Sequence, residues 1–332
     1  MEKEEKNVCS FRTSIGGQAL IEGILMRGPK KQAIVCRTRD GLVEKIDELK
    51  LIKDRYPILG VPLIRGCAIF LDSLVKGMQA LTWSADQVPL EEQGEPDKLD
   101  LWIEAHFPED KAQKLIVGLA VVLGIALSIG LFVFLPAFIV RLLNWDKTMS
   151  LPLVNLLEGL FRVAILLGYM FLVSKVKDIK RVFSYHGAEH KTIFCYEHGK
   201  ALTVENVREE SRFHPRCGTS FLVVIMIISI FVVSVMTWVL SLFPGIAELP
   251  KILAALVRIV GKLILLPIIV GLTYELNRWV GRHDENAFAR AVAWPGKQIQ
   301  HLTTSEPDDG MIECAIEAVK LVIPEVKGAD EW

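Results

Sequence analysis

The sequence predicts a mainly α-helical membrane protein with four transmembrane helices, a small α+β unit at the N-terminus, a His-rich loop and a helical C-terminal tail. Three observations predict this class. Hydrophobic residues make up 51% of the 332 residues, with a mean hydropathy of +0.36, which is more apolar than an average soluble domain. Two long runs contain no ionisable side chain. The basic residues are spread unevenly along the chain.

The long apolar runs define the spans. Residues 115–140 and 221–243 contain no ionisable side chain, and both runs exceed the ~20 residues that cross a bilayer core. Two further runs are long and apolar enough but carry charges. We therefore expect spans at 115–140, 151–174, 219–243 and 252–278.

The distribution of Lys and Arg predicts the orientation. Residues 1–114 contain 17, the loop 175–216 contains 9, and the chain from 278 onward contains 6. The two short connections, 141–150 and 244–251, contain three in all. Because cytoplasmic loops carry the excess of basic residues, both termini and the central loop are expected in the cytoplasm. The 38 basic and 39 acidic residues balance, so we expect no nucleic-acid partner.

We expect a different structure in each segment outside the spans. A cytoplasmic α/β unit at 1–61 should contain a hairpin at Asp40-Gly41, and its glycines at 16, 17, 23 and 28 favour tight turns. An amphipathic membrane-surface helix is expected at 62–84, then an acidic linker and short helix at 85–114. The cytoplasmic tail at 279–332 should contain a helix that begins at Ser305 or Asp308.

The central loop, 175–218, concentrates the residues that could carry chemistry. Four of the seven histidines lie between 186 and 214. His186, Glu189 and His190 form H-x-x-E-H, which on a helix puts both imidazoles on one face. This is the spacing of inverted zinc-protease sites, in which the Glu is general base toward a metal-bound water. A divalent metal, zinc first, is therefore the expected cofactor.

The third ligand is ambiguous in sequence. His214 and Cys217 are spaced H-x-x-C just before the third span, and Glu205, Glu209 and Glu210 are carboxylate alternatives. Glu197 would lie ~16 Å along the helix from His186, too far to share an ion. Three ligands with an open position would make a catalytic site, and four N and S donors a closed structural one. A polar cluster that binds no metal is the other interpretation.

A second group of polar residues is intramembrane. Two pairs lie four residues apart at similar depth in the second and fourth spans: Glu158 with Arg162, and Arg258 with Lys262. Ionisable groups in a bilayer usually face a bundle interior or a wet cavity. The pairs are interpreted either as a structural or interfacial contact, or as a path for an ion or a lipid headgroup.

Four segments carry a family resemblance: GGQALIEGILMRGP (16–29), YHGAEHKTIFCYE (185–197), SRFHPRCGTSF (211–221) and EPDDGMIE (306–313). Together and in this order they resemble the YqhQ-like family of uncharacterised bacterial multi-pass membrane proteins, and this resemblance implies a location in a bacterial plasma membrane. That family is labelled as predicted metal-dependent enzymes. The resemblance implies a site made by His186, Glu189, His190, His214 and Cys217.

Three functional hypotheses follow. The first is a hydrolase with a cytoplasmic-face metal site that acts on a membrane-proximal lipid or peptide. The second is a non-enzymatic component that assists the assembly of another membrane protein complex, with the His/Cys cluster structural. The third is a small ion or lipid transporter that uses the intramembrane charges. The sequence names neither the oligomeric state nor the partner.

Overall fold

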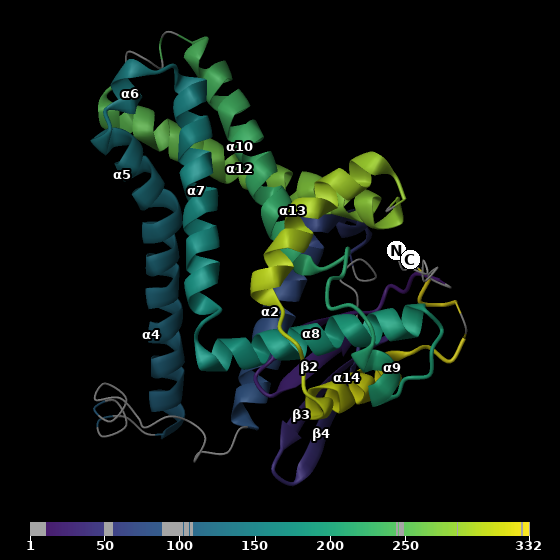
Figure 1. The fold of residues 1–332 in the computed structure, drawn as a ribbon. Coiled ribbons are helices and arrows are strands. Elements are labelled where there is room, and N and C mark those ends of the chain that lie inside the picture. The colour runs from purple at the N-terminus through teal and green to yellow at the C-terminus, as the bar shows by residue number, and fades with distance from the viewer. Residues whose placement is uncertain are drawn as a thin grey trace. The chain divides into compact units, whose positions relative to one another are not determined.

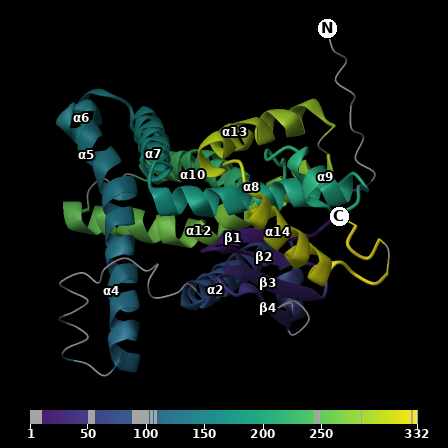
Figure 2. The ribbon, with the colours of Figure 1, turned by 60° about the horizontal axis from the view of Figure 1, so that its bottom comes forward.

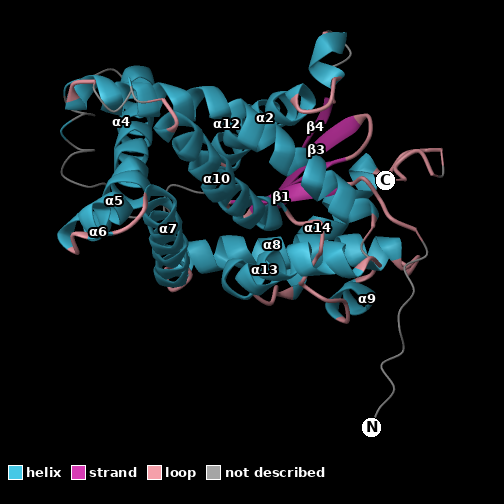
Figure 3. Ribbon diagram, turned by 90° about the horizontal axis from the view of Figure 1, so that it is seen from above, coloured by secondary structure: helices cyan, strands magenta, loops and turns pink. Residues whose placement is uncertain are grey.

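The computed structural model describes residues 11–49, 56–87, 109–243, 249–283, 285–326 and 328–331, with 102, 106 and 245. Residues 88–101 of the expected acidic linker lie outside the described residues. The chain is mostly helical (Figure 3), and the strands of the described residues fall between Gly16 and Glu48 in the sequence. The chain forms two compact units, one of residues 1–88, 170–229 and 262–332 and the other of 89–169 and 230–261.

Four described helices are long and apolar enough to cross a membrane, as the sequence predicted: Leu115–Leu142, Leu151–Val173, Phe221–Ser241 and Ile259–Arg282. No more than 22% of the most apolar window in any of them is buried within the protein. The first span consists of α4 (Glu109–Ile129), η2 (Gly130–Phe134) and α5 (Leu135–Leu142). The second, third and fourth spans lie in α7 (Leu151–Val173), α10 (Gly218–Ser241) and α12 (Lys251–Arg282), respectively. A short helix, α6 (Trp145–Thr148), lies between the first two spans.

The first span contains a π-helical turn, η2, just before Pro136. Proline has no N–H to donate to the carbonyl four residues earlier, which is that of Phe132. Arg162 of α7 donates from Nε to this carbonyl at 2.8 Å. In a bilayer, backbone polar groups need partners within the protein. Arg162 therefore supplies a hydrogen bond from the second span to the carbonyl that Pro136 leaves without its helical donor in the first.

The N-terminal strands form an antiparallel sheet in the order β1 (Gly16–Leu20), β2 (Gly23–Arg27), β3 (Lys31–Thr38) and β4 (Gly41–Glu48). The predicted hairpin is confirmed, since Thr38 pairs with Gly41, whose φ is +128°. The expectation of tight turns at the earlier glycines is wrong for Gly16 and Gly17, which lie in β1, whereas Gly23 closes the two-residue turn between β1 and β2, where it pairs with Leu20. A Cβ at Gly23 would lie 2.4 Å from the Cys36 sulfur, so this glycine is required for close packing.

Helices cover both faces of this sheet (Figures 1 and 2). Alternate residues of β2 and β3 point to opposite faces, and both faces are buried. Ile24, Met26 and Val35 pack with α8 (Lys177–Glu197) and α14 (Asp309–Val322), near the short α9 (Val204–Arg208). Leu25 and Ile34 pack on the other face with Ala80 of α2 (Ile64–Asp86), which follows η1 (Pro57–Gly60).

The C-terminal segment contains two helices, α13 (Ala287–Thr303) and α14. Asp308 caps α14 by accepting a hydrogen bond from the Met311 N–H at 2.8 Å, which confirms one of the two predicted starts. Helix α13 was not predicted, because it contains Pro295. The link between the two helices passes close to α8, where a Cβ on Gly187 would lie 2.1 Å from the Ser305 carbonyl oxygen. Gly187 therefore permits this close approach.

We predict that Gly187→Ala lowers the thermal unfolding temperature of the detergent-purified protein, with a loss on the order of 2 kcal/mol, because the new methyl group displaces the Ser305 backbone. The matched control is Gly168→Ala in α7, where a Cβ meets nothing within 4 Å. Alanine is the better helix former, so the control should be neutral or slightly stabilising. Equal unfolding temperatures for the two variants would contradict the close packing.

Candidate metal centre

Helix α8 carries the H-x-x-E-H residues on one face, as their spacing predicts. His186, Glu189 and His190 lie in its continuous helical stretch, with His190 2% exposed and Glu189 6% exposed. The two imidazole centroids are 4.3 Å apart. The helix therefore presents two nitrogen donors and a carboxylate together in a buried environment.

Backbone carbonyls orient both imidazoles. Nδ1 of His186 donates to the Thr303 carbonyl at 2.8 Å, and Nδ1 of His190 donates to the Arg212 carbonyl at 2.6 Å. In a neutral ring, a proton on Nδ1 leaves Nε2 with the lone pair that can bind a metal. Hydrogen bonds of this kind fix the tautomer and the direction of histidines that bind metals.

Cys217 completes the group from the loop before α10. Its Sγ lies 3.2 Å from Nε2 of His186, and one donor atom each from His186, His190 and Cys217 lies within 4.8 Å of the others. Burial alone would raise the pKa of the Cys217 thiol, but His190 and His186 lower it well below the usual 9.0. Burial lowers the pKa of His186, yet the neighbouring Cys217 raises it to about 9. The three side chains form a group that could bind a metal.

Glu189 lies beside this group. One carboxylate oxygen accepts a hydrogen bond from the Gly17 N–H at 3.1 Å, and the other, Oε2, is buried with no hydrogen-bond partner among the described residues. Burial raises the pKa of this carboxyl above its usual 4.5, while His186 and His190 oppose the rise. A Cβ at Gly17 would lie 3.1 Å from the Glu189 Cδ, so strand β1 closes over the carboxylate.

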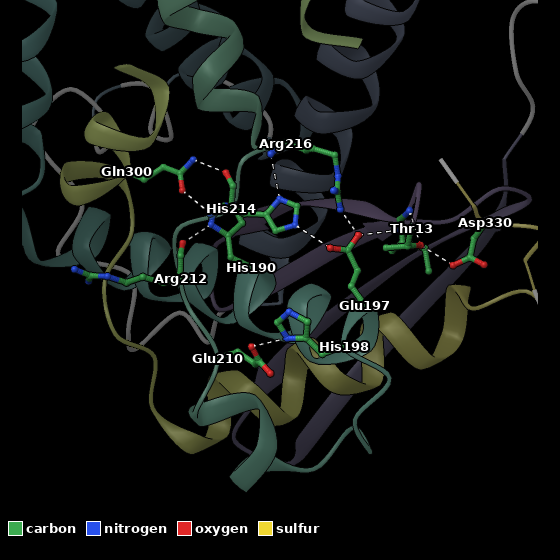
Figure 4. Close-up of polar contacts among 11 residues, drawn as sticks. Thr13, His190, Glu197, His198, Glu210, Arg212, His214, Arg216, Gln300 and Asp330 are labelled. Carbon is green, nitrogen blue, oxygen red and sulfur yellow. Dashed lines mark hydrogen bonds and ion pairs between the residues drawn. The ribbon is translucent and has the colours of Figure 1, made fainter. Parts of the chain in front are cut away.

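His214 is directed to a different set of partners (Figure 4). Its backbone N–H donates to Gln300 at 2.8 Å, its Nδ1 accepts from the Arg216 N–H, and its Nε2 is 3.6 Å from Glu197. Burial lowers the pKa of His214 to about 4. The ring centroid is 5.5 Å from that of His190. His214 therefore lies beside the three-residue group but outside it.

The fully buried Glu197 also accepts hydrogen bonds from the Thr13 N–H, at 2.8 Å, and from the Arg216 guanidinium. The carboxylate alternatives lie elsewhere. Glu205 and Glu209 are exposed, and Glu210 pairs with His198 at 2.9 Å and with Lys200 at 2.8 Å.

The structure describes the side chains of three of the four predicted intramembrane charged residues. Glu158 and Arg162 are half-buried, and Lys262 is exposed. The side chain of Arg258 lies outside the described residues. The expected meeting of the two charged pairs stays a prediction.

The comparisons with known proteins place this site in a family. The family described as "Protein of unknown function (DUF1385)" matches residues 61–325. The chain belongs to the DUF1385 family. It is also similar to the Bacillus subtilis (strain 168) protein named "Uncharacterized protein YqhQ", with 32% identity over 310 residues, which cover 91% of this chain and 90% of that protein. The YqhQ-like resemblance is thereby confirmed.

No solved structure matches the chain. The DUF1385 match covers α8, Cys217 and the four spans. The chain is therefore a bacterial membrane protein of the DUF1385 family with a His/His/Cys group.

The buried His214 predicts a pH dependence of stability. Its pKa is about 4 in the folded chain and 6.5 when exposed, so the unfolded chain binds more protons between these values. Stability is then fully present above pH 6.5 and is lost as the pH falls toward 4, by up to about 3 kcal/mol. Unfolding temperatures at pH 7 and pH 5 should differ more for the wild type than for His214→Gln. The same decrease in both proteins would contradict this assignment.

Proposed function

We propose that this chain is a metal-dependent hydrolase whose site lies at the cytoplasmic face of the membrane. His186, His190 and Cys217 would hold zinc or a similar divalent ion. The observation that carries the proposal is the convergence of these three donors within 4.8 Å, with Nδ1 of both imidazoles already bonded to carbonyls. Two imidazoles and a thiolate suit zinc, and three protein ligands leave a position open for a substrate or water.

Glu189 is the proposed general base. A divalent ion in this site would act as a Lewis acid and make a water more acidic. Glu189 would take the proton of the attacking water and return it to the leaving group as the scissile bond breaks. Its Oε2, which has no hydrogen-bond partner among the described residues, and its raised pKa suit a group that takes up and releases a proton. The Gly17 N–H would hold the other oxygen in place.

The position of Cys217 supports a membrane-proximal substrate. Cys217 is four residues before Phe221, where the third apolar span begins, so the site is close to one end of a span. The excess of basic residues in the central loop and in both terminal segments supports a cytoplasmic location for that end of the span. The substrate class would be a lipid or a membrane peptide whose scissile bond lies at the headgroup level.

The contact between Cys217 and His186 supports a second candidate. A thiol 3.2 Å from an imidazole nitrogen is also the arrangement of a cysteine nucleophile and its base. A cysteine hydrolase would use the same residues without a metal, so metal content separates the two candidates.

The deciding measurement is metal content by mass spectrometry on detergent-purified protein. We expect about one equivalent of zinc in the wild type and none in the double variant His186→Ala, His190→Ala. The control is His283→Ala, His301→Ala, which removes two exposed imidazoles outside the group and should keep the metal. A folded wild type that stays free of metal after zinc is resupplied would overturn the metal-dependent proposal.

A second prediction tests the role of Glu189. Glu189→Gln should keep the metal, because the carboxylate is not one of the three ligands, and should lower hydrolysis at least about 100-fold. The probes are a long-chain p-nitrophenyl ester and a fluorogenic hydrophobic peptide in vesicles. Unchanged turnover in the variant would remove Glu189 from the mechanism. A zinc-loaded wild type that cleaves neither probe would favour the non-enzymatic assembly role for the cluster.

A further inference from the structure

The segment before and at the start of α2 contacts the middle of the fourth span. A Cβ on Gly271 would lie 2.6 Å from the Leu63 carbonyl oxygen, and a Cβ on Gly66 would lie 3.1 Å from the Gly271 Cα. The Cys67 thiol donates to the Pro267 carbonyl at 3.0 Å. The two helices therefore cross with their backbones nearly in contact, at a pair of glycines, as close-packed membrane helices do.

The crossing point lies deep in the span. Pro267 is eight residues from Ile259 and Gly271 is eleven residues from Arg282, the two ends of the fourth span. At 1.5 Å per residue these are about 12 Å and 16 Å, so the contact is near the centre of a hydrocarbon core ~30 Å thick. A helix that rested on the membrane surface would not reach these residues.

The rest of α2 leads from this depth back to the sheet. The Phe70 ring stacks on Phe221, the first residue of the third span, with centroids 5.7 Å apart. Further on, Gly77 packs against Gln18 of β1, and Ala80 lies in the core beneath the sheet. Along α2, the partners thus change from mid-span residues to a span end and then to the N-terminal sheet.

The only charged side chain in residues 57–71 is neutralised by the fourth span. Arg65 forms two hydrogen bonds with the carboxylate of Glu275, which also accepts from the Leu63 N–H at 3.4 Å. Glu275 therefore holds the N-terminus of α2, where a negative charge is favourable. The next charges along the chain, Asp72 and Lys76, pair with each other at 2.8 Å.

The outward face of this segment is apolar and exposed. Ile58 is 67% exposed and Leu71 is 60% exposed, and further apolar side chains are exposed with them: Val61, Leu63, Ile64 and Ile69. Contiguous apolar surface of this kind is rare on a face that meets water. Leu263 and Ile264 of the fourth span, three to four residues before the Pro267 that Cys67 contacts, are exposed as well.

We infer that Pro57–Leu71 is a re-entrant element whose outward face is covered by lipid acyl chains. Residues 57–64 contain no charge, and in and after the 3-10 helix η1 the N–H groups of Leu59 and Val61 donate to the carbonyls of Tyr56 and Ile58, as backbone groups in a bilayer must find partners within the chain. Polar side chains gather further along α2, where Asp72 pairs with Lys76 and Arg27 donates a hydrogen bond to Ser73. These charges mark the level at which α2 leaves the hydrocarbon. For residues 57–71 this element replaces the expected surface helix, and it does not depend on whether the His/Cys group binds a metal.

The test uses wild-type protein in vesicles of phosphatidylethanolamine and phosphatidylglycerol with photoactivatable lipids. One lipid carries a diazirine at the end of its acyl chain, in the bilayer centre, and the other carries it beside the headgroup. After irradiation, mass spectrometry of the peptides locates the adducts. We expect residues 57–71 to be labelled by the chain-end probe within about threefold of residues 221–241, and residues 41–48 of strand β4 to be unlabelled.

The other outcomes overturn the inference. Labelling of 57–71 by the headgroup probe alone would mean that the helix rests on the surface. Absence of both adducts, with 221–241 labelled, would mean that protein covers this face. Gly66→Leu should reduce chain-end labelling of 57–71 at least fivefold, because the side chain blocks the crossing, while labelling of 221–241 stays unchanged. The control Gly124→Leu lies in a helix where a Cβ meets nothing within 4 Å, and it should leave both signals unchanged.

Discussion

The buried carboxylate of Glu197 is the interaction on which the candidate site depends. It lies at the last residue of α8 and accepts hydrogen bonds from the Thr13 backbone and the Arg216 side chain, with His214 beside it. These partners come from the chain before the sheet and from the loop before the third span (Figure 4). Removing one member of such a buried pair commonly costs about 3–5 kcal/mol, because the other charge is left without a partner. Glu197 therefore fixes where the loop carrying Cys217 meets α8.

Much of the fold could be predicted because it depends on local patterns. The four spans follow from long apolar runs, the β3–β4 hairpin from Asp40-Gly41, and the start of α14 from Asp308. Helix α13 could not be predicted in this way, since Pro295 interrupts its local signal and its position depends on tertiary contacts such as Gln300 with His214. Gly17 was misread for the same reason, because its close approach to the Leu25 carbonyl on the neighbouring strand leaves no mark in a single sequence.

The candidate site, like the fold, could be predicted from the sequence only in part. His186, Glu189 and His190 share a helical face, and spacing alone predicts that. Spacing cannot choose between His214 and Cys217, which are three residues apart in a non-helical loop. The partners that direct His214 away are Glu197 and Gln300, which are 17 and 86 residues distant in sequence. The groups that orient the two imidazoles are backbone carbonyls, which every residue has, so no residue type identifies them.

The contact between Arg162 and the first span links two positions that are 30 residues apart in sequence. The guanidinium is useful at this depth because Pro136 leaves the Phe132 carbonyl without its usual helical donor. In a chain with another residue at 136, the carbonyl would regain an N–H, and a charge at 162 would become a cost in the bilayer. Selection should therefore act on the proline and the arginine as a pair, so that the loss of either one during evolution favours the loss of the other.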